Sequence, residues 1–324
     1  MTLKDKVLLS IIQNGNEYIS GEELAHKLNV SRNAVWKAVK QLEQEGFAVE
    51  AVRNRGYRIA SEENKLHGAF IQRYLKTEKY GQNLIILDET DSTNNYAKKL
   101  AQEGTPHGTV VAADCQNAGK GRLGRTFVSP KGTGLYVSLV LTENISISSA
   151  QLITACAAVA AAEAVEELCS CDIKIKWVND LFLNDKKLCG ILTEASMSFE
   201  SNQLDYVIIG IGINVNSLNG KIPEELNEIV TSIEDETHEK ISRNQLCAVL
   251  LEKLEKRLNE LDSKAFLDEY RKRSMIIGRM VTVEDRNGSH IGKAVAIADD
   301  AGLTIEYENG EIKTINSGEA RIYK

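Results

Sequence analysis

The chain is poor in the residues that mark linkers, disulfide frameworks and zinc sites. Its 324 residues include only three prolines and six cysteines. No Cys-x-x-Cys pair is present, and the spacing of Cys169 and Cys171 is too short for the usual pairs of zinc ligands. Scattered cysteines of this kind predict reduced, mostly buried thiols in a cytoplasmic protein, without a disulfide or a metal.

A long apolar run and a net positive charge are also missing. The N-terminal stretch MTLKDKVLLS lacks the apolar core of a signal peptide. The most apolar window, ITACAAVAAAEAV, is interrupted by Glu163 and is too short to span a bilayer. The formal net charge is −7, so nucleic-acid binding would need a local basic surface. The composition thus predicts a cytoplasmic protein with no membrane partner, and the length suggests two or three domains at roughly 100–200 residues each.

Such a basic surface is predicted in a first domain, residues 1–62. The pattern there is helix, helix, tight turn, helix and β-hairpin, which is the order of a winged helix-turn-helix domain. The third helix, SRNAVWKAVKQLEQEGF, starts at the cap Ser31 and stops at Gly46. Over residues 30–60, six Lys and Arg stand against three acidic residues. The sequence therefore predicts a DNA-binding domain at the N-terminus.

The first turn of this helix and the hairpin offer polar and basic side chains to base edges and phosphates. A helical protein-interaction module with a solvated basic face is the alternative. The order of elements and the placement of charge both favour DNA. The predicted DNA-binding residues are Ser31, Arg32, Asn33, Trp36, Lys37, Arg53 and Arg55, and the hairpin also offers Arg58.

The rest of the chain divides into a large mixed domain and a small β domain. Short apolar strands and helices over residues 65–273 predict an α+β fold around a mixed sheet. One strand is expected over IKIKWVND, residues 173–180, and one helical stretch over residues 242–274. Residues 276–324 alternate with period two between turn pairs such as Asn287-Gly288, which predicts a small barrel of four or five strands.

The loop QNAGKGRLGRTF, residues 116–127, has the Gly-x-Gly-x-x-Gly spacing of nucleotide-binding loops. A Rossmann loop needs a helix that begins at the glycines, and RTFVSPKGTGLYV follows instead. The kinase signatures are absent too. Three glycines and three cations in seven residues favour a basic flap over an anionic, phosphorylated ligand, because glycines let backbone amides approach it. The alternative is a solvated surface loop.

Polar residues near two further strands are candidates for the same site. Lys176, Asn179 and Asp180 follow an apolar strand. Lys187 stands in the otherwise apolar stretch KLCGIL, so its ammonium is expected to point into a cleft. The alternative for Lys187 is a solubilising lysine at a hairpin edge.

Together these stretches resemble the biotin–protein ligases, in the bifunctional form that also represses the biotin operon. The resemblance covers nearly the whole chain, and its motifs occur in the family's order. They are DSTN (91–94), QNAGKGRLGR (116–125), SPKGTGLYVSLVL (129–141), KWVNDLFL (176–183), KLCGILTE (187–194) and IGIGINVN (209–216).

The resemblance implies a winged helix, a central ligase domain and a small SH3-like β-barrel. It also implies a two-step acyl transfer. Biotin and ATP form biotinyl-5′-adenylate with the help of Mg²⁺, and the biotinyl group then passes to a lysine of the biotin carboxyl carrier protein. In bifunctional members the adenylate is also the corepressor, and it favours a homodimer on a two-half-site operator DNA. The same surface then pairs either with itself or with the carrier protein.

Site residues follow from the matching motifs. The resemblance makes Lys187 and Arg122 the catalytic residues. It places biotin against Ser92, Thr93, Asn94, Gln116, Lys120, Gly121, Arg122, Lys187 and Gly190. It places ATP against Gly119, Arg122, Arg125, Lys176, Asn179 and Asp180, with Asp180 beside the metal ion.

Three positions depart from the family's usual residues: Lys120 stands for Arg, Phe127 for Trp and Val178 for Pro. None of them removes a charge that the chemistry needs. Two other functions remain open at this point. One is a transcription factor that senses a ligand through an inactive ligase-like domain, which the presence of Lys187 and Arg122 disfavours. The other is a ligase of the related lipoate type.

Overall fold

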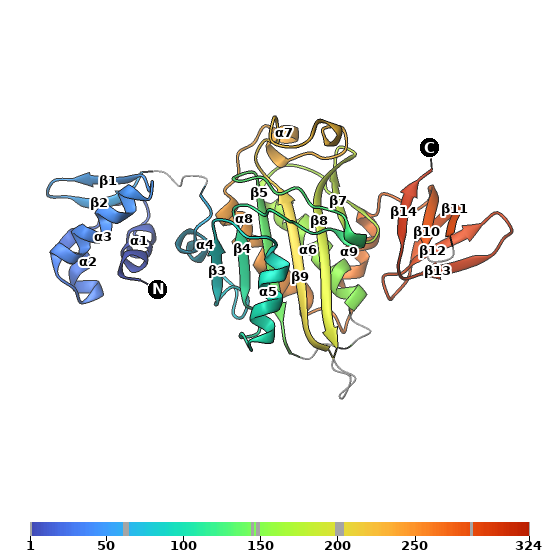
Figure 1. Ribbon diagram of the computed structural model, residues 1–324, viewed down its shortest axis with the longest axis horizontal. Helices are drawn as coiled ribbons and strands as arrows, with labels where there is room; N and C mark the ends of the chain where they lie inside the picture. The colour runs from blue at the N-terminus through green and yellow to red at the C-terminus, as the bar shows by residue number, and fades with distance from the viewer. Residues whose placement is uncertain are drawn as a thin grey trace.

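The computed structural model describes residues 2–60, 65–143, 146, 150–197, 204–285 and 288–323. Figure 1 shows three parts along the longest axis: an N-terminal helical unit, a central sheet with helices on both faces, and a C-terminal antiparallel sheet. This arrangement confirms the predicted α+β fold with a winged helix-turn-helix, a mixed-sheet domain and a small β domain. In the part of the chain that is described, no helix is both long and apolar enough to cross a membrane.

The N-terminal unit has the predicted order of elements. Its third helix begins after Ser31, whose Oγ accepts a hydrogen bond from the Ala34 amide at 3.1 Å and so caps the helix. The apolar side chains Val35, Ala38, Val39 and Leu42 of this helix are buried against the other two helices. The elements are α1 (Leu3–Gln13), α2 (Gly21–Leu28), α3 (Arg32–Gln44), β1 (Val49–Val52) and β2 (Gly56–Ile59).

A short helix, α4 (Gly68–Tyr74), joins this unit to the central domain. The sequence patterns do not indicate it. Phe70 packs in the core of the N-terminal unit, whereas its neighbour Ile71 packs in the core of the central domain. The two faces of one helix therefore connect the two cores.

The central sheet has seven strands in the order β3-β4-β5-β9-β8-β7-β6. Only β3 and β4 are parallel, and every other neighbouring pair is antiparallel, so the sheet is mixed as predicted. The strands are β3 (Leu84–Leu87), β4 (Val110–Ala113), β5 (Gly134–Leu141), β6 (Lys174–Lys176), β7 (Asp180–Leu183), β8 (Lys186–Met197) and β9 (Leu204–Asn214).

Each face of this sheet has its own cover. Helices α6 (Ala150–Leu168) and α8 (Arg243–Leu258) pack on one face over the main core, and α5 (Thr93–Gln102) lies on the other (Figure 1). In β9 the isoleucines 209, 211 and 213 belong to the main core, so the intervening Gly210 and Gly212 face the side of α5. This second face holds the site described below.

Two elements differ from the predictions. The strand expected over residues 173–180 is confined to β6, because the chain turns at Trp177 and Val178 before β7 begins. The helical stretch expected over residues 242–274 is two helices, α8 and α9 (Phe266–Arg273), separated by a turn around Lys264, whose φ is 56°. The short helix α7 (Ile233–Thr237) and a helical turn at Glu224–Leu226 were not predicted.

The C-terminal domain is a five-stranded antiparallel sheet in the order β13-β12-β11-β10-β14. In the described residues its edge strands β13 and β14 each pair with one neighbour only, so closure into an SH3-like barrel stays a prediction. Trp177 of the central domain donates a buried hydrogen bond from Nε1 to the Ala301 carbonyl at 2.9 Å and ties the two domains together. The strands are β10 (Met280–Asp285), β11 (Gly288–Ile297), β12 (Leu303–Tyr307), β13 (Ile312–Ile315) and β14 (Glu319–Ile322).

Candidate active site and DNA-binding surface

A pocket lies on the α5 side of the central sheet, over a floor of glycines. Gly190 of β8 pairs with Gly212 of β9, and Gly210 pairs with Ser138 of β5. A Cβ atom at Gly210 would lie 2.1 Å from Asn94 Oδ1, and one at Gly212 would lie 2.5 Å from the Phe127 ring. Any side chain at these positions would therefore clash with Asn94 or Phe127 and displace them from the pocket. This is the physical reason for the alternation in IGIGIN, in which isoleucines point to the core and glycines to the pocket.

Almost every site residue expected from the sequence lines this pocket. The exception is Gly119, which packs under the flap: an added Cβ there would lie 2.3 Å from the Phe127 carbonyl oxygen. Gly119 therefore allows a close approach between two backbone segments. The expected residues that do line the pocket are Ser92, Thr93, Asn94, Gln116, Lys120, Gly121, Arg122, Arg125, Lys176, Asn179, Asp180, Lys187 and Gly190.

The basic flap folds back on itself over the pocket. The Gly121 amide donates to the Arg125 carbonyl at 2.7 Å, and Lys120 and Thr126 form an isolated antiparallel bridge. Only a single 3₁₀ turn, Arg122–Gly124, lies between them. No α-helix starts at the glycines, as predicted, so the flap itself offers no helix N-terminus to a ligand. The groups of the flap that attract an anion most strongly are therefore its three cations, Lys120, Arg122 and Arg125.

Arg122 is the partly buried cation of the flap. Its guanidinium donates to Asn179 Oδ1 at 3.2 Å and to the Gly318 carbonyl at 3.2 Å. Within the described ranges no carboxylate lies in ion-pair distance of it, and burial lowers the pKa of Arg122. A partly buried guanidinium with unused donors is a site for an anion such as a carboxylate or phosphate.

Arg125 is engaged differently. Its guanidinium forms two parallel hydrogen bonds with the carboxylate of Glu319, at 3.0 and 2.5 Å. The Arg125 hydrogen bonds hold the pKa of Glu319 down to about 2. Gly318 and Glu319 belong to the C-terminal domain and both line the pocket. Sequence reasoning missed them, because no local pattern links them to a flap almost 200 residues earlier.

Two lysines complete the basic wall. Lys187 Nζ lies 2.7 Å from Asp180 Oδ1, and Lys187 is anchored because its amide donates to the Ile229 carbonyl at 2.9 Å. Lys176 is partly buried, which lowers its pKa, and it has no ion-pair partner in the residues described. Lys187 therefore points into a cleft, as expected, and is not a solubilising edge residue.

The residues present also fit one Mg²⁺ that arrives with a nucleotide. The described ranges hold no group of three or more His, Cys, Asp and Glu side chains that could form a protein-only metal site. Mg²⁺ in nucleotide sites is held by one or two carboxylates and by substrate phosphates. Asp180 can supply such a carboxylate. Its buried Oδ1 forms an ion pair with Lys187 but accepts no hydrogen bond of good geometry, so it can still bind a cation.

A chain of hydrogen bonds runs along the other end of the pocket. Gln116 Oε1 accepts from the amide of Thr93 at 2.9 Å, and Ser138 Oγ lies 2.8 Å from Thr93 Oγ1 and 2.7 Å from Asn94 Oδ1. Asn94 Nδ2 donates to Glu194 Oε2 at 2.7 Å. Ser138 and Glu194 were not predicted, since each sits in an apolar strand stretch that gives no sign of a site. Together these partners fix the orientation of both side-chain amides.

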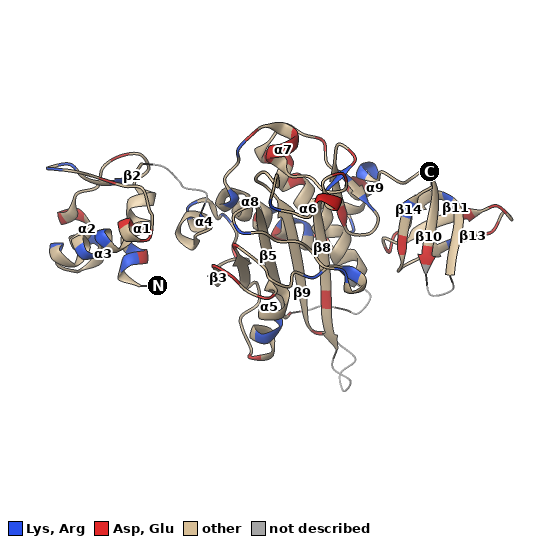
Figure 2. Cartoon of the chain, turned by 45° about the horizontal axis from the view of Figure 1, so that its top comes forward, with Lys and Arg blue, Asp and Glu red and all other residues tan. Residues whose placement is uncertain are grey.

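The predicted DNA-binding residues are all exposed on the N-terminal unit. Basic residues follow α3 and the turn between β1 and β2 (Figure 2). The side chain of Trp36 is 50% exposed, which is unusual for tryptophan. Arg55 stacks on the Tyr18 ring, 4.3 Å from its centroid. The exposed residues of this set are Ser31, Arg32, Asn33, Trp36, Lys37, Arg53 and Arg55.

Arg58 departs from the expectation for the hairpin. It lies on β2, two strand residues after the turn, and forms an ion pair with Glu50 of β1 at 2.7 Å. Its charge is therefore neutralised within the hairpin, and Arg53 and Arg55 are left as the basic residues of the turn.

Models of known protein families match all three parts of the chain. Residues 84–214 match the biotin/lipoate A/B protein ligase family, residues 4–58 match a helix-turn-helix domain, and residues 276–322 match the C-terminal domain of biotin protein ligases. A bifunctional ligase/repressor from Bacillus subtilis is 39% identical over 324 residues, which is 99% of both chains. The chain belongs to the bifunctional branch of the biotin protein ligase family.

Other members of this family agree in sequence and in structure. The bifunctional ligase/repressor of Escherichia coli is 29% identical, over 96% of this chain and 95% of its own. A structure of the biotin protein ligase from Aquifex aeolicus, solved with biotin and ATP, is 31% identical with a TM-score of 0.63. It covers 75% of this chain and 99% of the Aquifex chain.

The three departures from the family's usual residues are accommodated locally. Lys120 Nζ donates to Asn95 Oδ1 at 2.6 Å, at the edge of α5. Phe127 lies on the glycine floor, where a Cβ at Gly190 would be 3.1 Å from its ring. The Val178 carbonyl accepts a buried hydrogen bond from the Tyr270 hydroxyl at 2.9 Å. Lys120 thus keeps the positive charge of the pocket, and Phe127 keeps an aromatic ring in its lining.

Proposed function

We propose that the protein is a biotin protein ligase that also represses transcription of biotin genes. Its substrates are biotin and ATP, and its intermediate is biotinyl-5′-adenylate. The observation that carries the proposal is the convergence of Arg122, Lys176 and Lys187 on one pocket above a glycine floor. Three cations in a partly buried pocket are suited to a triphosphate and a carboxylate.

In the first step a carboxylate oxygen of biotin attacks the α-phosphorus of ATP and pyrophosphate leaves. The chain's part in this step is positioning and charge neutralisation. Lys187 and Arg122 contact the biotin carboxylate and the oxygens of the α-phosphate, so negative charge does not oppose the approach of the two substrates. Lys176 and Asn179 contact the triphosphate, and Arg125 closes the flap from outside. Asp180 would hold Mg²⁺, which would neutralise phosphate charge.

The polar chain at the other end of the pocket receives the ureido ring of biotin. A ureido group has one carbonyl acceptor and two N–H donors. Asn94 Oδ1 accepts from Ser138 and keeps a second lone pair, and Gln116 Nε2 donates to Ser129 and keeps a second N–H. These two unused groups match one donor and the acceptor of the ring. Ser92, Thr93, Lys120, Gly121 and Gly190 enclose the rest of the molecule.

In the second step the ε-amine of a lysine attacks the acyl carbon of the adenylate and AMP leaves. The lysine belongs to the biotin carboxyl carrier protein. The adenylate is also the corepressor: it orders the flap and promotes a homodimer that presents two winged helices to a two-half-site operator. We assign residues 1–62 to DNA binding, 65–273 to catalysis and 276–324 to the C-terminal domain, in a cytoplasmic protein.

The test is transfer of biotin to the carrier protein. The full chain is incubated with ATP, Mg²⁺, biotin and a carrier domain, and intact-mass spectrometry follows the carrier. We expect one biotinyl group on one lysine, and none when the target lysine is replaced by arginine. An unmodified carrier, with the adenylate detected in the same tube, would remove the transfer step from the proposal. Sedimentation with and without biotin plus ATP tests the homodimer, which is expected only with both.

A further inference from the structure

Two cysteine side chains meet at the turn between α6 and β6, on the side of the sheet away from the pocket. Helix α6 ends at Leu168, and Cys169 and Cys171 follow it directly. Their Sγ atoms lie 3.2 Å apart, and either sulfur can donate to the other. The other four cysteines, at 115, 156, 189 and 247, make no contact with another thiol in the described part of the chain.

The backbone holds the two thiols on the same side of the turn. The Cys169 amide donates to the Val165 carbonyl at 3.1 Å, which continues the helical pattern by one residue. The Cys171 amide donates back to the Cys169 carbonyl at 3.1 Å. This hydrogen bond closes a three-residue turn, so the first and third side chains come together. The short distance between the sulfurs therefore follows from the fold of the segment.

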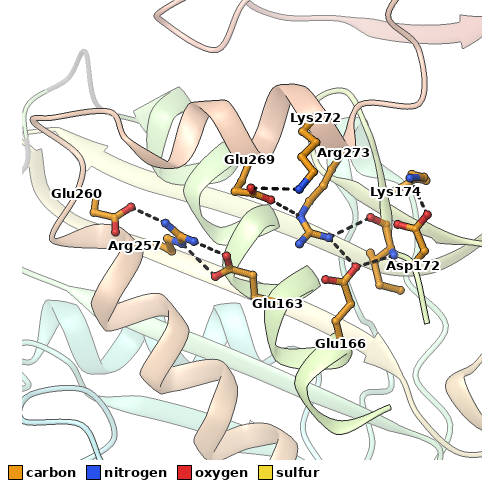
Figure 3. A network of polar contacts seen from close by, with 10 residues as sticks. Glu163, Glu166, Asp172, Lys174, Arg257, Glu260, Glu269, Lys272 and Arg273 are labelled. Atoms are coloured by element: carbon orange, nitrogen blue, oxygen red, sulfur yellow. Dashed lines mark hydrogen bonds and ion pairs between the residues drawn. The ribbon is translucent and has the colours of Figure 1, made fainter. Parts of the chain in front are cut away.

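The segment after the turn is also fixed. The Ile173 amide donates to Glu166 Oε1 at 2.9 Å, and the same oxygen accepts from Arg273 Nη1 at 2.6 Å. Figure 3 shows this network, in which Glu166 of α6 and Arg273 of α9 meet beside the chain that leads into β6. With the helix end on one side and this network on the other, the two thiols are held together rather than brought together by chance motion.

We propose that Cys169 and Cys171 form a reversible dithiol–disulfide site. The inference does not depend on the ligase function. A disulfide has an S–S length of about 2.05 Å, so the sulfurs need to approach by only about 1 Å from their present separation. In a reducing compartment such disulfides are transient and serve as redox sensors. The co-reactant we name is a low-molecular-weight disulfide, RSSR.

The two thiols are suited to different steps of thiol–disulfide exchange. Cys171 is partly exposed, whereas Cys169 is only 5% exposed. The hydrogen bond from Cys171 lowers the pKa of Cys169, against the opposing effect of burial. Loss of one proton from the pair thus leaves a thiolate that the remaining S–H stabilises, and a thiolate is the nucleophile in thiol–disulfide exchange.

The pair first loses one proton, and its remaining proton passes from Cys171 to Cys169 across their contact. The exposed Cys171 then attacks RSSR as the thiolate, forms a mixed disulfide and expels RS⁻, which takes up the first proton. The Cys169 thiolate then attacks the Cys171 sulfur and expels RS⁻, which takes up the second proton. One S–S bond forms in the protein and one breaks in RSSR, the two thiols are oxidised, and two RSH are produced. Reduced glutathione in excess reverses both steps.

The test uses the full chain in glutathione buffers of increasing oxidised fraction. Free thiols are alkylated under denaturing conditions, and the peptides are mapped by mass spectrometry. We expect Cys169 and Cys171 to lose their alkyl labels together, on a peptide lighter by two hydrogens. We expect this at an oxidised-to-reduced glutathione ratio at least about tenfold below the ratio that attaches glutathione to Cys115.

Two variants complete the test. Cys171→Ser removes one partner and should leave residue 169 alkylated over the whole range, whereas Cys247→Ser should keep the disulfide. If Cys169 and Cys171 of the unaltered chain stay alkylated until Cys115 reacts, or if each takes up glutathione without closing, the proposal is wrong. Because this result is read from the unaltered chain, poor folding of a variant does not affect it.

Discussion

Lys187 Nζ lies 2.7 Å from Oδ1 of Asp180, and that carboxylate oxygen accepts no directed hydrogen bond from any described residue. The pair joins the start of β7 to the start of β8 inside the pocket. In the absence of substrate each charge balances the other. Under the proposed function, we expect Lys187 to turn its charge to the carboxylate of biotin and the α-phosphate when substrates bind, which would leave Asp180 for the metal ion. The ion pair therefore keeps both groups in place and ready.

The first prediction concerns Lys187. Replacing it with alanine should lower biotin-dependent ATP–pyrophosphate exchange by about 100-fold or more, the usual effect of removing one donor to developing charge. The matched control is Lys186→Ala, one residue earlier on β8 and outside the pocket lining. Circular dichroism of both variants checks that the fold is kept. Exchange near the unaltered level in Lys187→Ala would remove this lysine from the chemistry.

The second prediction concerns Ser138, which sits between Thr93 and Asn94 under the pocket. Ser138→Ala leaves Asn94 Oδ1 without that donor, so the amide is less firmly oriented toward biotin. A hydrogen bond contributes about 1 kcal/mol, which predicts about a fivefold rise in KM for biotin. The KM for ATP should not change. Ser196→Ala, farther along β8, is the control, and an equal rise in both KM values would indicate a general structural effect instead.

The third prediction concerns the pair that closes the flap against the C-terminal domain. Hydrogen bonds from Arg125 depress the pKa of Glu319 to about 2. The pair therefore stabilises the folded chain at pH values above the ordinary pKa of a glutamate side chain. This contribution should be complete near pH 7 and shrink as the pH falls below about 4.5 toward 2, because Glu319 is protonated earlier in the unfolded chain. Glu319→Gln should lower the unfolding free energy most at neutral pH.

Denaturant unfolding from pH 7 to the acid limit of the native state measures this difference. The control is Glu306→Gln on the exposed side of β12. The account would be contradicted if the difference in unfolding free energy between Glu319→Gln and the unaltered chain grew as the pH fell. Since Arg125 contributes to closing the flap, the same variant should also release biotinyl-adenylate faster.

The fourth prediction separates DNA binding from catalysis. Arg32 is exposed on the first turn of α3. Arg32→Ala should weaken operator binding and reduce the slope of log affinity against log salt by about 1 if this residue contacts one phosphate. ATP–pyrophosphate exchange should stay unchanged. Lys6→Ala, an exposed lysine of α1, is the charge-matched control, and loss of operator affinity in both variants alike would point to general charge rather than a recognition helix.

Much of the fold could be read from local patterns. Ser31 as a helix cap and the period-two strands of the C-terminal domain are each encoded within a few residues, and the structure has both. The predicted ends of helices and strands were wrong where tertiary contacts determine them. Trp177 leaves its expected strand to bond with Ala301, and α4 forms because Phe70 and Ile71 have two different cores to fill.

The residues of the site also divide into those that local sequence patterns indicate and those that they do not. Lys187, Asp180 and Arg122 stand out because a charge in an apolar strand or a glycine-rich loop is a local anomaly. Ser138, Glu194, Gly318 and Glu319 do not, because their role comes only from strand register and from the docking of the C-terminal domain. Likewise, the spacing of Cys169 and Cys171 gives no hint of a thiol pair, which depends on the turn after α6.

The central claim is that this pocket activates biotin with ATP. The direct measurement is to incubate the protein with ATP, Mg²⁺ and either biotin or lipoate, and to identify the acyl-adenylate by mass spectrometry. The account predicts biotinyl-5′-adenylate with biotin, no adduct with lipoate, and no adduct with Lys187→Ala. Lipoyl-adenylate as the main product, or no adenylate with either acid from a folded protein, would contradict it.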